Sequence, residues 1–150
     1  MENDKLQELH NLFLSLIPLF NKCKNYIEKN NAGPLCNKNQ SMAVMIIGKA
    51  ESITPTTLSK FINMEKGSLT TLIDSLEEKE LVTRFNDPND RRKVLLSLTT
   101  KGIEYMESIE EQSRNGLTLM VRDLEDDKID QMYASLKTLV EILREISGSI

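Results

Sequence analysis

The chain has 150 residues and a net charge of −4 at pH 7, and 39% of its residues are hydrophobic. These values are typical of a single soluble globular domain. No apolar run is long enough to span a membrane, and the acidic start over residues 1–4 does not resemble a signal peptide. Cys23 and Cys36 give neither a disulfide framework nor a metal-binding motif, so we expect a cytoplasmic protein without a metal site or a cofactor.

The amino-terminal segment is predicted to be helical, because apolar residues recur at helical spacing over residues 6–20. Pro18 lies inside this pattern, and we expect it to kink the helix or split it in two. A polar loop over residues 30–38 follows, and residues 40–47 are predicted to form a buried helix. The apolar residues of the first pattern are Leu6, Leu9, Phe13, Leu16, Ile17 and Phe20.

Residues 54–76 have the pattern of two helices separated by a short turn. Pro55 suits the first position of a helix, and the hydroxyl of Thr54 can accept from the free amide groups there. The first helix has one apolar side, formed by Leu58, Phe61 and Ile62. After a break at Asn63 and Met64, apolar residues at i, i+3, i+4 and i+7 predict a second amphipathic helix: Leu69, Leu72, Ile73 and Leu76.

The polar side of the second helix carries short or flexible side chains. Such groups can reach base edges or phosphates when a helix lies in the major groove of DNA. A solvated helix face has a similar composition, so the neighbouring segment decides between the two interpretations. The residues on this side are Lys66, Ser68, Thr70, Thr71 and Ser75.

A β-hairpin is predicted directly after this helix. Residues 81–85 and 93–98 have the composition of strands, and a cluster of turn formers over residues 86–90 lies between them. Basic residues gather on this hairpin, with Arg84 on the incoming strand and Arg91, Arg92 and Lys93 near the tip. A thin loop that carries arginine can enter a minor groove, where the negative potential attracts guanidinium groups. The order helix, turn, helix, hairpin is that of a winged helix-turn-helix.

The two tip arginines are expected to have different roles. We expect one of them to pair with Asp87 or Asp90 and stiffen the hairpin, and Arg91 to be the residue that enters the groove. The hairpin segment 84–93 contains four basic and two acidic residues, although the whole chain is acidic. DNA binding depends on the charge of the face that meets phosphate, so the negative net charge does not exclude it.

The carboxyl-terminal part is predicted to form two helices, a long one over residues 100–122 and a second one with a wide apolar face. Neither this last helix nor the amino-terminal one has an obvious partner within a small winged-helix core. They either pack on the domain or form a helical dimer interface. The apolar residues of the last helix are Ile129, Met132, Tyr133, Leu136, Val140 and Leu143.

Three short motifs together resemble the signature of the multiple antibiotic resistance regulator (MarR) family. They are Leu81-Val82-Thr83-Arg84, Asp87-Pro88-Asn89-Asp90-Arg91-Arg92 and Leu98-Thr99-Thr100-Lys101-Gly102. The chain departs from the family pattern twice. Members often have glycine where this chain has Glu80, so the second helix of the pair is expected to lack the usual left-handed cap. Many members have arginine where this chain has Asn89.

The resemblance implies a mainly α fold with a small β-hairpin wing, in a single chain over residues 1–150. Residues 38–100 are expected to form the DNA-binding lobe, and residues 1–30 and 101–150 a helical dimerisation region. A homodimer of this kind is expected to bind a pseudo-palindromic operator in double-stranded DNA as a repressor. The expected DNA contacts are Thr56, Lys66, Ser68, Thr70, Thr71, Ser75, Arg84, Asn89, Arg91, Arg92 and Lys93, with Asp87 and Asp90 stabilising the wing.

Release from DNA by a small ligand is also implied by the resemblance, with aromatic acids such as salicylate as generic ligands. The apolar residues expected near a ligand crevice are Phe13, Ile17, Met42 and Met45. Two alternatives remain open. One is redox sensing through Cys23, which is flanked by Lys22 and Lys24. The other is a winged-helix module that binds protein instead of DNA. An enzyme is not expected, because the chain has one histidine and no nucleophile motif or phosphate-binding glycine loop.

Overall fold

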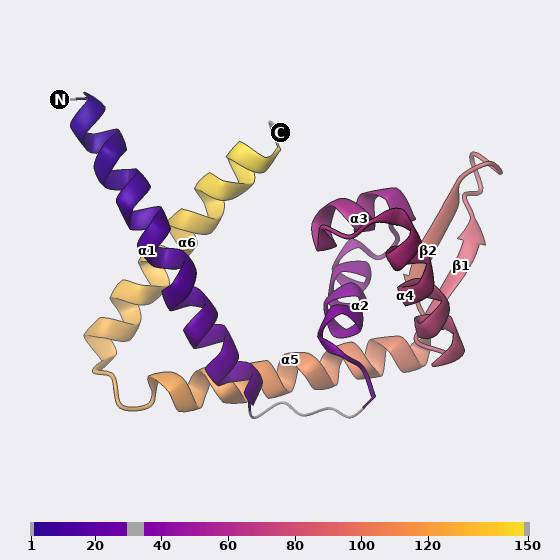
Figure 1. Ribbon diagram of the computed structural model, residues 1–150. Helices are drawn as coiled ribbons and strands as arrows, with labels where there is room; N and C mark the ends of the chain where they lie inside the picture. The colour runs from indigo at the N-terminus through magenta and orange to yellow at the C-terminus, as the bar shows by residue number, and fades with distance from the viewer. Residues whose placement is uncertain (1, 30–34, 149–150) are drawn as a thin grey trace. The chain divides into compact units, whose positions relative to one another are not determined.

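The computed structural model describes residues 2–29 and 35–148, which form six helices and a two-stranded hairpin. The mainly α fold class with a hairpin wing is confirmed. In chain order the elements are α1 (Glu2–Lys29), α2 (Lys38–Ala50), α3 (Pro55–Ile62), α4 (Lys66–Glu78), β1 (Val82–Asn86), β2 (Val94–Leu98), α5 (Thr100–Val121) and α6 (Asp126–Ser147), as Figure 1 shows.

The chain divides into two compact units. One unit contains Met1–Ile27 and Asn115–Ile150, and the other contains Glu28–Arg114. The first unit is purely helical in its described part, and the second holds α2, α3, α4 and the hairpin. We refer to them as the helical unit and the winged-helix unit. In the described residues no helix is both long and apolar enough to cross a membrane.

In the helical unit, α1 continues through Pro18 as one helix. The expectation that the proline splits this helix is therefore wrong. Proline removes a single helical hydrogen bond, to the carbonyl of Leu14, and the surrounding leucine, lysine and asparagine residues continue the pattern on both sides. The helix also approaches α5 closely, because a Cβ atom added to Gly116 would lie 2.8 Å from the carbonyl oxygen of Ile27. Glycine is needed at this contact.

Apolar side chains of α1 and α6 remain exposed within the chain. Every described residue over positions 3–20 is exposed, and α6 has no buried residue in the described part of the chain. The exposed fraction is 61% for Leu6, 60% for Phe20 and 69% for Tyr133. Apolar faces of this extent are unusual for a monomer and are typical of interaction surfaces.

The core of the winged-helix unit is formed by apolar residues from α2, α3 and α4 and from the hairpin. The residues that the sequence pattern assigned to the inner side of α4 are buried, with Leu76 and Ile73 at 1% exposure or less. The cluster consists of Ala43, Val44, Ile47, Ile53, Leu58, Leu69, Leu72, Ile73, Leu76, Leu81, Val82 and Leu96. This core fixes α4 and the hairpin in one unit.

The start and end of α3 follow from local chemistry. The Thr54 side chain accepts a hydrogen bond from the backbone N–H of Thr57 (3.2 Å), and Pro55 occupies the first turn. Asn63 then ends the helix in the left-handed conformation, with φ of 56°. Asparagine tolerates this region better than most residues, so the turn between α3 and α4 is set at this position.

The hairpin pairs β1 with β2 in antiparallel register, from Val82 opposite Leu98 to Asn86 opposite Val94. On its other edge β2 exchanges two backbone hydrogen bonds with Ile53, of 3.1 and 2.8 Å. The segment before α3 is thereby joined to the base of the wing. The hairpin is thereby anchored through β2.

The carboxyl end of α4 has a left-handed cap, contrary to the expectation from Glu80. Glu80 has φ of 60°. Its N–H donates to the carbonyl of Glu77 (2.8 Å), and the N–H of Leu81 donates to the carbonyl of Leu76 (3.0 Å). These two bonds, together with the buried side chains of Leu76 and Leu81, make a Schellman motif. The motif forms without glycine because the core contact of Leu81 and the backbone bonds impose it.

Replacing Glu80 with glycine is expected to raise the free energy of unfolding by about 1 kcal/mol, because glycine adopts positive φ without strain. The ion pair that is lost, from Glu80 to Lys101 (3.4 Å), is exposed and contributes little. Thermal and urea denaturation of the two proteins measure the difference. Replacement of Glu80 by alanine is the control, since it removes the same charge without relieving the backbone. Equal stability of the glycine and alanine variants would contradict this explanation.

The start of α5 is built from the Leu-Thr-Thr-Lys-Gly motif. The hydroxyl of Thr99 donates to the carbonyl of Glu80 (2.5 Å) and accepts from the N–H of Gly102 (3.0 Å). A Cβ atom at Gly102 would lie 2.0 Å from the carbonyl oxygen of Leu81. Thr99 therefore caps the helix, and glycine permits its first turn to pack against the end of α4.

Further along, α5 packs on α2 within the same unit. Tyr105 and Ser41 share a hydrogen bond (3.1 Å), and Lys49 pairs with Glu110. Burial raises the pKa of the Tyr105 hydroxyl. These contacts fix the first half of α5 to the winged-helix unit.

Candidate nucleic-acid interface

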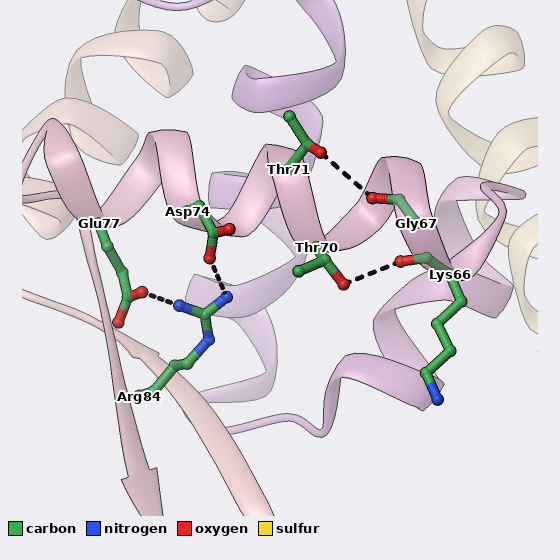
Figure 2. A network of polar contacts seen from close by, with 7 residues as sticks. All are labelled: Lys66, Gly67, Thr70, Thr71, Asp74, Glu77 and Arg84. Carbon is green, nitrogen blue, oxygen red and sulfur yellow. Dashed lines mark hydrogen bonds and ion pairs between the residues drawn. The ribbon is translucent and has the colours of Figure 1, made fainter.

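The amino-terminal half of α4 presents a polar surface without acidic side chains. Lys66, Ser68, Thr70 and Thr71 are exposed, and a Cβ atom added to Gly67, which lies among them, would meet nothing within 4 Å. The hydroxyl of Thr70 donates to the carbonyl of Lys66 (3.0 Å), and that of Thr71 to the carbonyl of Gly67 (3.3 Å), as Figure 2 shows. Both hydroxyl oxygens keep lone pairs that can accept from a base edge.

Ser75 occupies a different environment from the exposed one that the sequence indicated. It is half-buried, and its hydroxyl oxygen accepts from Nε2 of Gln40 (2.7 Å). Gln40 of α2 lies against this flank of α4 and binds the hydroxyl there. Ser75 is therefore engaged inside the winged-helix unit.

Acidic residues follow in the carboxyl-terminal half of α4, and Arg84 of β1 pairs with two of them. One guanidinium nitrogen of Arg84 contacts Oδ1 of Asp74 (2.6 Å), and the other contacts Glu77. Figure 2 shows the side chain reaching from the strand to both carboxylates on the helix. The Arg84 side chain is 31% exposed. Its charge is compensated within the protein, so the free positive charge of the wing lies nearer the tip than the sequence suggested.

The wing tip is held by its two aspartates through the backbone. The carboxylate of Asp87 accepts from the N–H of Asn89 (2.9 Å), and that of Asp90 from the N–H of Arg92 (3.0 Å). The backbone adds hydrogen bonds from Asp90 to Asp87 (3.2 Å) and from Lys93 to Asp90 (2.9 Å). These turns order the tip without using the arginine side chains.

The expected ion pair between a tip arginine and Asp87 or Asp90 is not formed in the described part of the chain. The basic partner of Asp87 is Lys93, at 3.9 Å. Arg91 and Arg92 are exposed. The expectation was wrong because the aspartate oxygens are directed to the backbone of the turn. Both guanidinium groups are thereby available to a ligand of opposite charge.

The remaining predicted DNA contacts are exposed residues. Thr56 lies in the first turn of α3, and Asn89 at the tip of the wing. Sequence reasoning missed three residues that shape this surface: Asp74 and Glu77, which hold Arg84, and Gln40, which holds Ser75. The opposite charges on α4 and β1 were a usable signal for the first two. Gln40 is the first residue of the predicted buried helix, and the sequence pattern gives no sign of its contact with Ser75.

The residues expected to bind a small ligand lie in different units. Phe13 and Ile17 are exposed on α1, and Met42 and Met45 are half-buried on α2. Cys23 is exposed and Cys36 is partly buried, and both thiols are free. No group of three or more metal-ligating side chains is found among the described residues.

Comparison with known proteins identifies this architecture. A family model described as the MarR family matches residues 36–94, from the segment before α2 to the first residue of β2. The reduced form of MarR from E. coli has a TM-score of 0.70 to this chain at 30% sequence identity, covering 83% of this chain and 93% of that one. The chain belongs to the MarR family of transcription regulators.

Other relatives match this chain over most of their length. The HTH-type transcriptional repressor YetL of Bacillus subtilis (strain 168) is 28% identical over 134 residues, which are 88% of this chain and 80% of YetL. A mutant MarR from E. coli, crystallised in complex with operator DNA, has a TM-score of 0.62 at 28% identity and covers 87% of this chain and 97% of its own. In this MarR-family member, the helix-turn-helix pair is α3 and α4, and the wing is β1 and β2.

Proposed function

We propose that this chain is a homodimeric repressor that binds a pseudo-palindromic operator in double-stranded DNA. The observation that carries the proposal is the arrangement within the winged-helix unit. The exposed first half of α4 bears Lys66 and hydroxyl groups, and the anchored wing beside it ends in two exposed arginines. A helix that reads the major groove and a loop that enters the adjacent minor groove need these two surfaces in one unit.

Each predicted DNA contact has a proposed task. Base edges in the major groove are contacted by Ser68, Thr70 and Thr71, and Lys66 contacts a phosphate. Thr56 in the first turn of α3 contacts the sugar-phosphate backbone of the DNA. At the wing, Arg91 enters the minor groove, and Arg92, Lys93 and Asn89 contact the flanking phosphates. Arg84 and Ser75 are proposed to hold the interface in place.

The homodimer is supported by the apolar faces of α1 and α6. Large apolar side chains on both helices are exposed within the chain, and leaving them in water is unfavourable. A two-fold interface between two copies buries both sets at once, and it relates two α4 helices by the same symmetry. Half-sites about 10 bp apart, one turn of DNA, then follow from the two-fold axis.

Repression, and its relief by a small aromatic ligand, is the finer part of the proposal. The relative YetL is named a transcriptional repressor. Met42 and Met45 on α2 are half-buried and lie outside the core cluster, so their side chains can adapt to a ligand without disturbing the core. Titration of the DNA complex with aromatic acids such as salicylate, for the wild type and for Met45→Ala, tests this part. Binding curves that do not move with any compound would leave a repressor without ligand control.

Arg84 is expected to support DNA binding by neutralising carboxylates. Replacing Arg84 with methionine is expected to weaken duplex binding about tenfold, about 1.4 kcal/mol, because Asp74 and Glu77 then repel the phosphates. The triple variant Arg84→Met, Asp74→Asn, Glu77→Gln removes the repulsion and is expected to recover most of the affinity. Fluorescence anisotropy with a labelled duplex measures all three proteins. If the triple variant binds the duplex as weakly as Arg84→Met alone, Arg84 contacts a phosphate directly instead.

A mobility-shift assay with fragments of the source genome tests the proposed function as a whole. A shifted fragment that resists excess unrelated duplex is expected, with two chains per DNA molecule. Absence of any preferred fragment, with retained fold by circular dichroism, would contradict the proposal and favour a winged-helix module that binds protein.

A further inference from the structure

Gln40 is the one buried polar residue in the part of the chain that the structure describes, with 7% of its surface exposed. It lies in the first turn of α2, and its amide group makes three hydrogen bonds. Its Oε1 accepts from the backbone N–H of Asn37 (3.0 Å) and from Nζ of Lys79 (2.8 Å), and its Nε2 donates to Oγ of Ser75 (2.7 Å). One side chain thus contacts the segment before α2 and the carboxyl-terminal half of α4.

The orientation of this amide is determined by its neighbours. The ammonium group of Lys79 and the backbone N–H of Asn37 can only donate, so both must face the amide oxygen. The amide nitrogen is thereby directed to Ser75, whose hydroxyl accepts. An amide turned by 180° would place a donor against two donors. The network has a single satisfied arrangement.

Lys79, at the carboxyl end of α4, adds a second connection. Besides Gln40, its ammonium group donates to the carbonyl of Leu35 (2.5 Å). Leu35 and Asn37 belong to the short segment 35–37, which enters α2. The end of α4 is therefore tied both to this segment and to the first turn of α2.

We propose that Gln40 is a positioning residue for DNA recognition, which sets the orientation of α4 relative to α2 and to the segment 35–37. The apolar core selects the side of α4 that faces inward. Apolar burial is non-directional, so it sets the exact rotation of α4 less strictly than hydrogen bonds do. Three hydrogen bonds from one buried amide have strict geometry, and leaving any of them unmade in the interior is unfavourable. This inference rests on the proposed DNA binding and adds the residue that orients the reading helix.

A matched set of variants tests this role. Gln40→Leu keeps the size of the side chain and removes all three hydrogen bonds. Asn37→Ala is the control, because it removes only the cap in which the Asn37 side chain accepts from the N–H of Gln40 (3.0 Å) and leaves the contacts to α4. Gln40→Glu is the rescue variant, since its carboxylate accepts from Lys79 and Asn37 and the hydroxyl of Ser75 can turn to donate.

Two measurements are made on each full-length protein. The first is hydrogen exchange of the peptides that cover α2 and α4. The second is the affinity for the duplex bound best by the wild type and for an unrelated duplex. Gln40→Leu is expected to increase hydrogen exchange in the second half of α4. It is also expected to lower the affinity for the operator about tenfold and the affinity for the unrelated duplex about twofold or less. The two affinities differ because phosphate contacts tolerate misorientation better than base contacts.

The control and the rescue variant have opposite expected results. Asn37→Ala should increase exchange only at the start of α2 and keep operator affinity within about twofold, and Gln40→Glu should recover most of the affinity lost in Gln40→Leu. Equal losses in Asn37→Ala and Gln40→Leu, or no rescue by glutamate, would overturn the proposal. If the wild type binds no duplex preferentially, the proposed function fails. Hydrogen exchange then tests the role of Gln40 by itself. An increase in exchange that is confined to α2 in Gln40→Leu would overturn the positioning role.

Discussion

Replacing Leu136 with glutamate is expected to convert the proposed homodimer into monomers and to abolish operator binding at concentrations where the wild type is saturated. Leu136 lies on α6, where 45% of its side chain is exposed within the chain. Burial of a leucine contributes about 1.5–3 kcal/mol, and a two-fold interface contains the residue twice. Loss of both contributions raises the dimer dissociation constant at least about 100-fold, and burying two carboxylates adds to this.

Lys137→Glu is the matched control for this variant. Lys137 is the next residue on α6 and belongs to its polar side, with Asp130, Glu141 and Arg144 at helical spacing. The control changes the net charge by more than Leu136→Glu does, but it adds no charge to the apolar face. Sedimentation velocity gives the mass of each variant over a range of concentrations. A Leu136→Glu protein that remains dimeric would remove α6 from the proposed interface.

Arg91→Ala is expected to lower duplex affinity by about 1–3 kcal/mol, because a guanidinium group in a narrow minor groove is lost. The slope of log affinity against log salt concentration is expected to fall by about 1, since one cation no longer displaces counterions from DNA. The side chain is exposed on a turn that is ordered by backbone bonds to Asp87 and Asp90, so its removal leaves the fold intact.

Arg122→Ala is the control for charge alone. Arg122 is an exposed arginine that follows α5 and pairs with Asp123 (3.4 Å) outside the winged-helix unit. Its replacement makes the same change in net charge, and we expect affinity and salt dependence to stay near those of the wild type. Similar losses in the two variants would indicate a nonspecific charge effect. An unchanged Arg91→Ala protein would transfer the groove contact to Arg92.

Helix positions were predictable because the apolar spacing and the local start signals agree. Thr54 and Pro55 begin α3, and the run from Leu69 to Leu76 gives the buried side of α4. The split expected at Pro18 and the missing left-handed cap expected at Glu80 were wrong for one common reason. A local preference of a few kcal/mol or less is overridden when a continuous helix or a buried neighbour such as Leu81 stabilises the less favourable backbone.

Side-chain partners were harder to predict than elements, because they depend on packing between segments distant in sequence. Ser75 is a residue type that can contact bases in a groove, but its hydroxyl binds Gln40, 35 residues earlier in the chain. Arg84 adds to the positive charge of the hairpin in the sequence, yet its guanidinium group binds Asp74 and Glu77 of α4. Helical periodicity assigns a residue to a side of a helix, but it does not say which neighbour covers the flank of that side.

Selection of duplexes from a random-sequence library by the purified full-length protein tests the central claim most directly, because the library contains every candidate half-site without bias. The proposal predicts an enriched inverted repeat with half-site centres about 10 bp apart, bound by two chains. It also predicts that Leu136→Glu fails to enrich this repeat. Enrichment of a single asymmetric half-site bound by one chain, or no enrichment by a folded protein, would contradict the account.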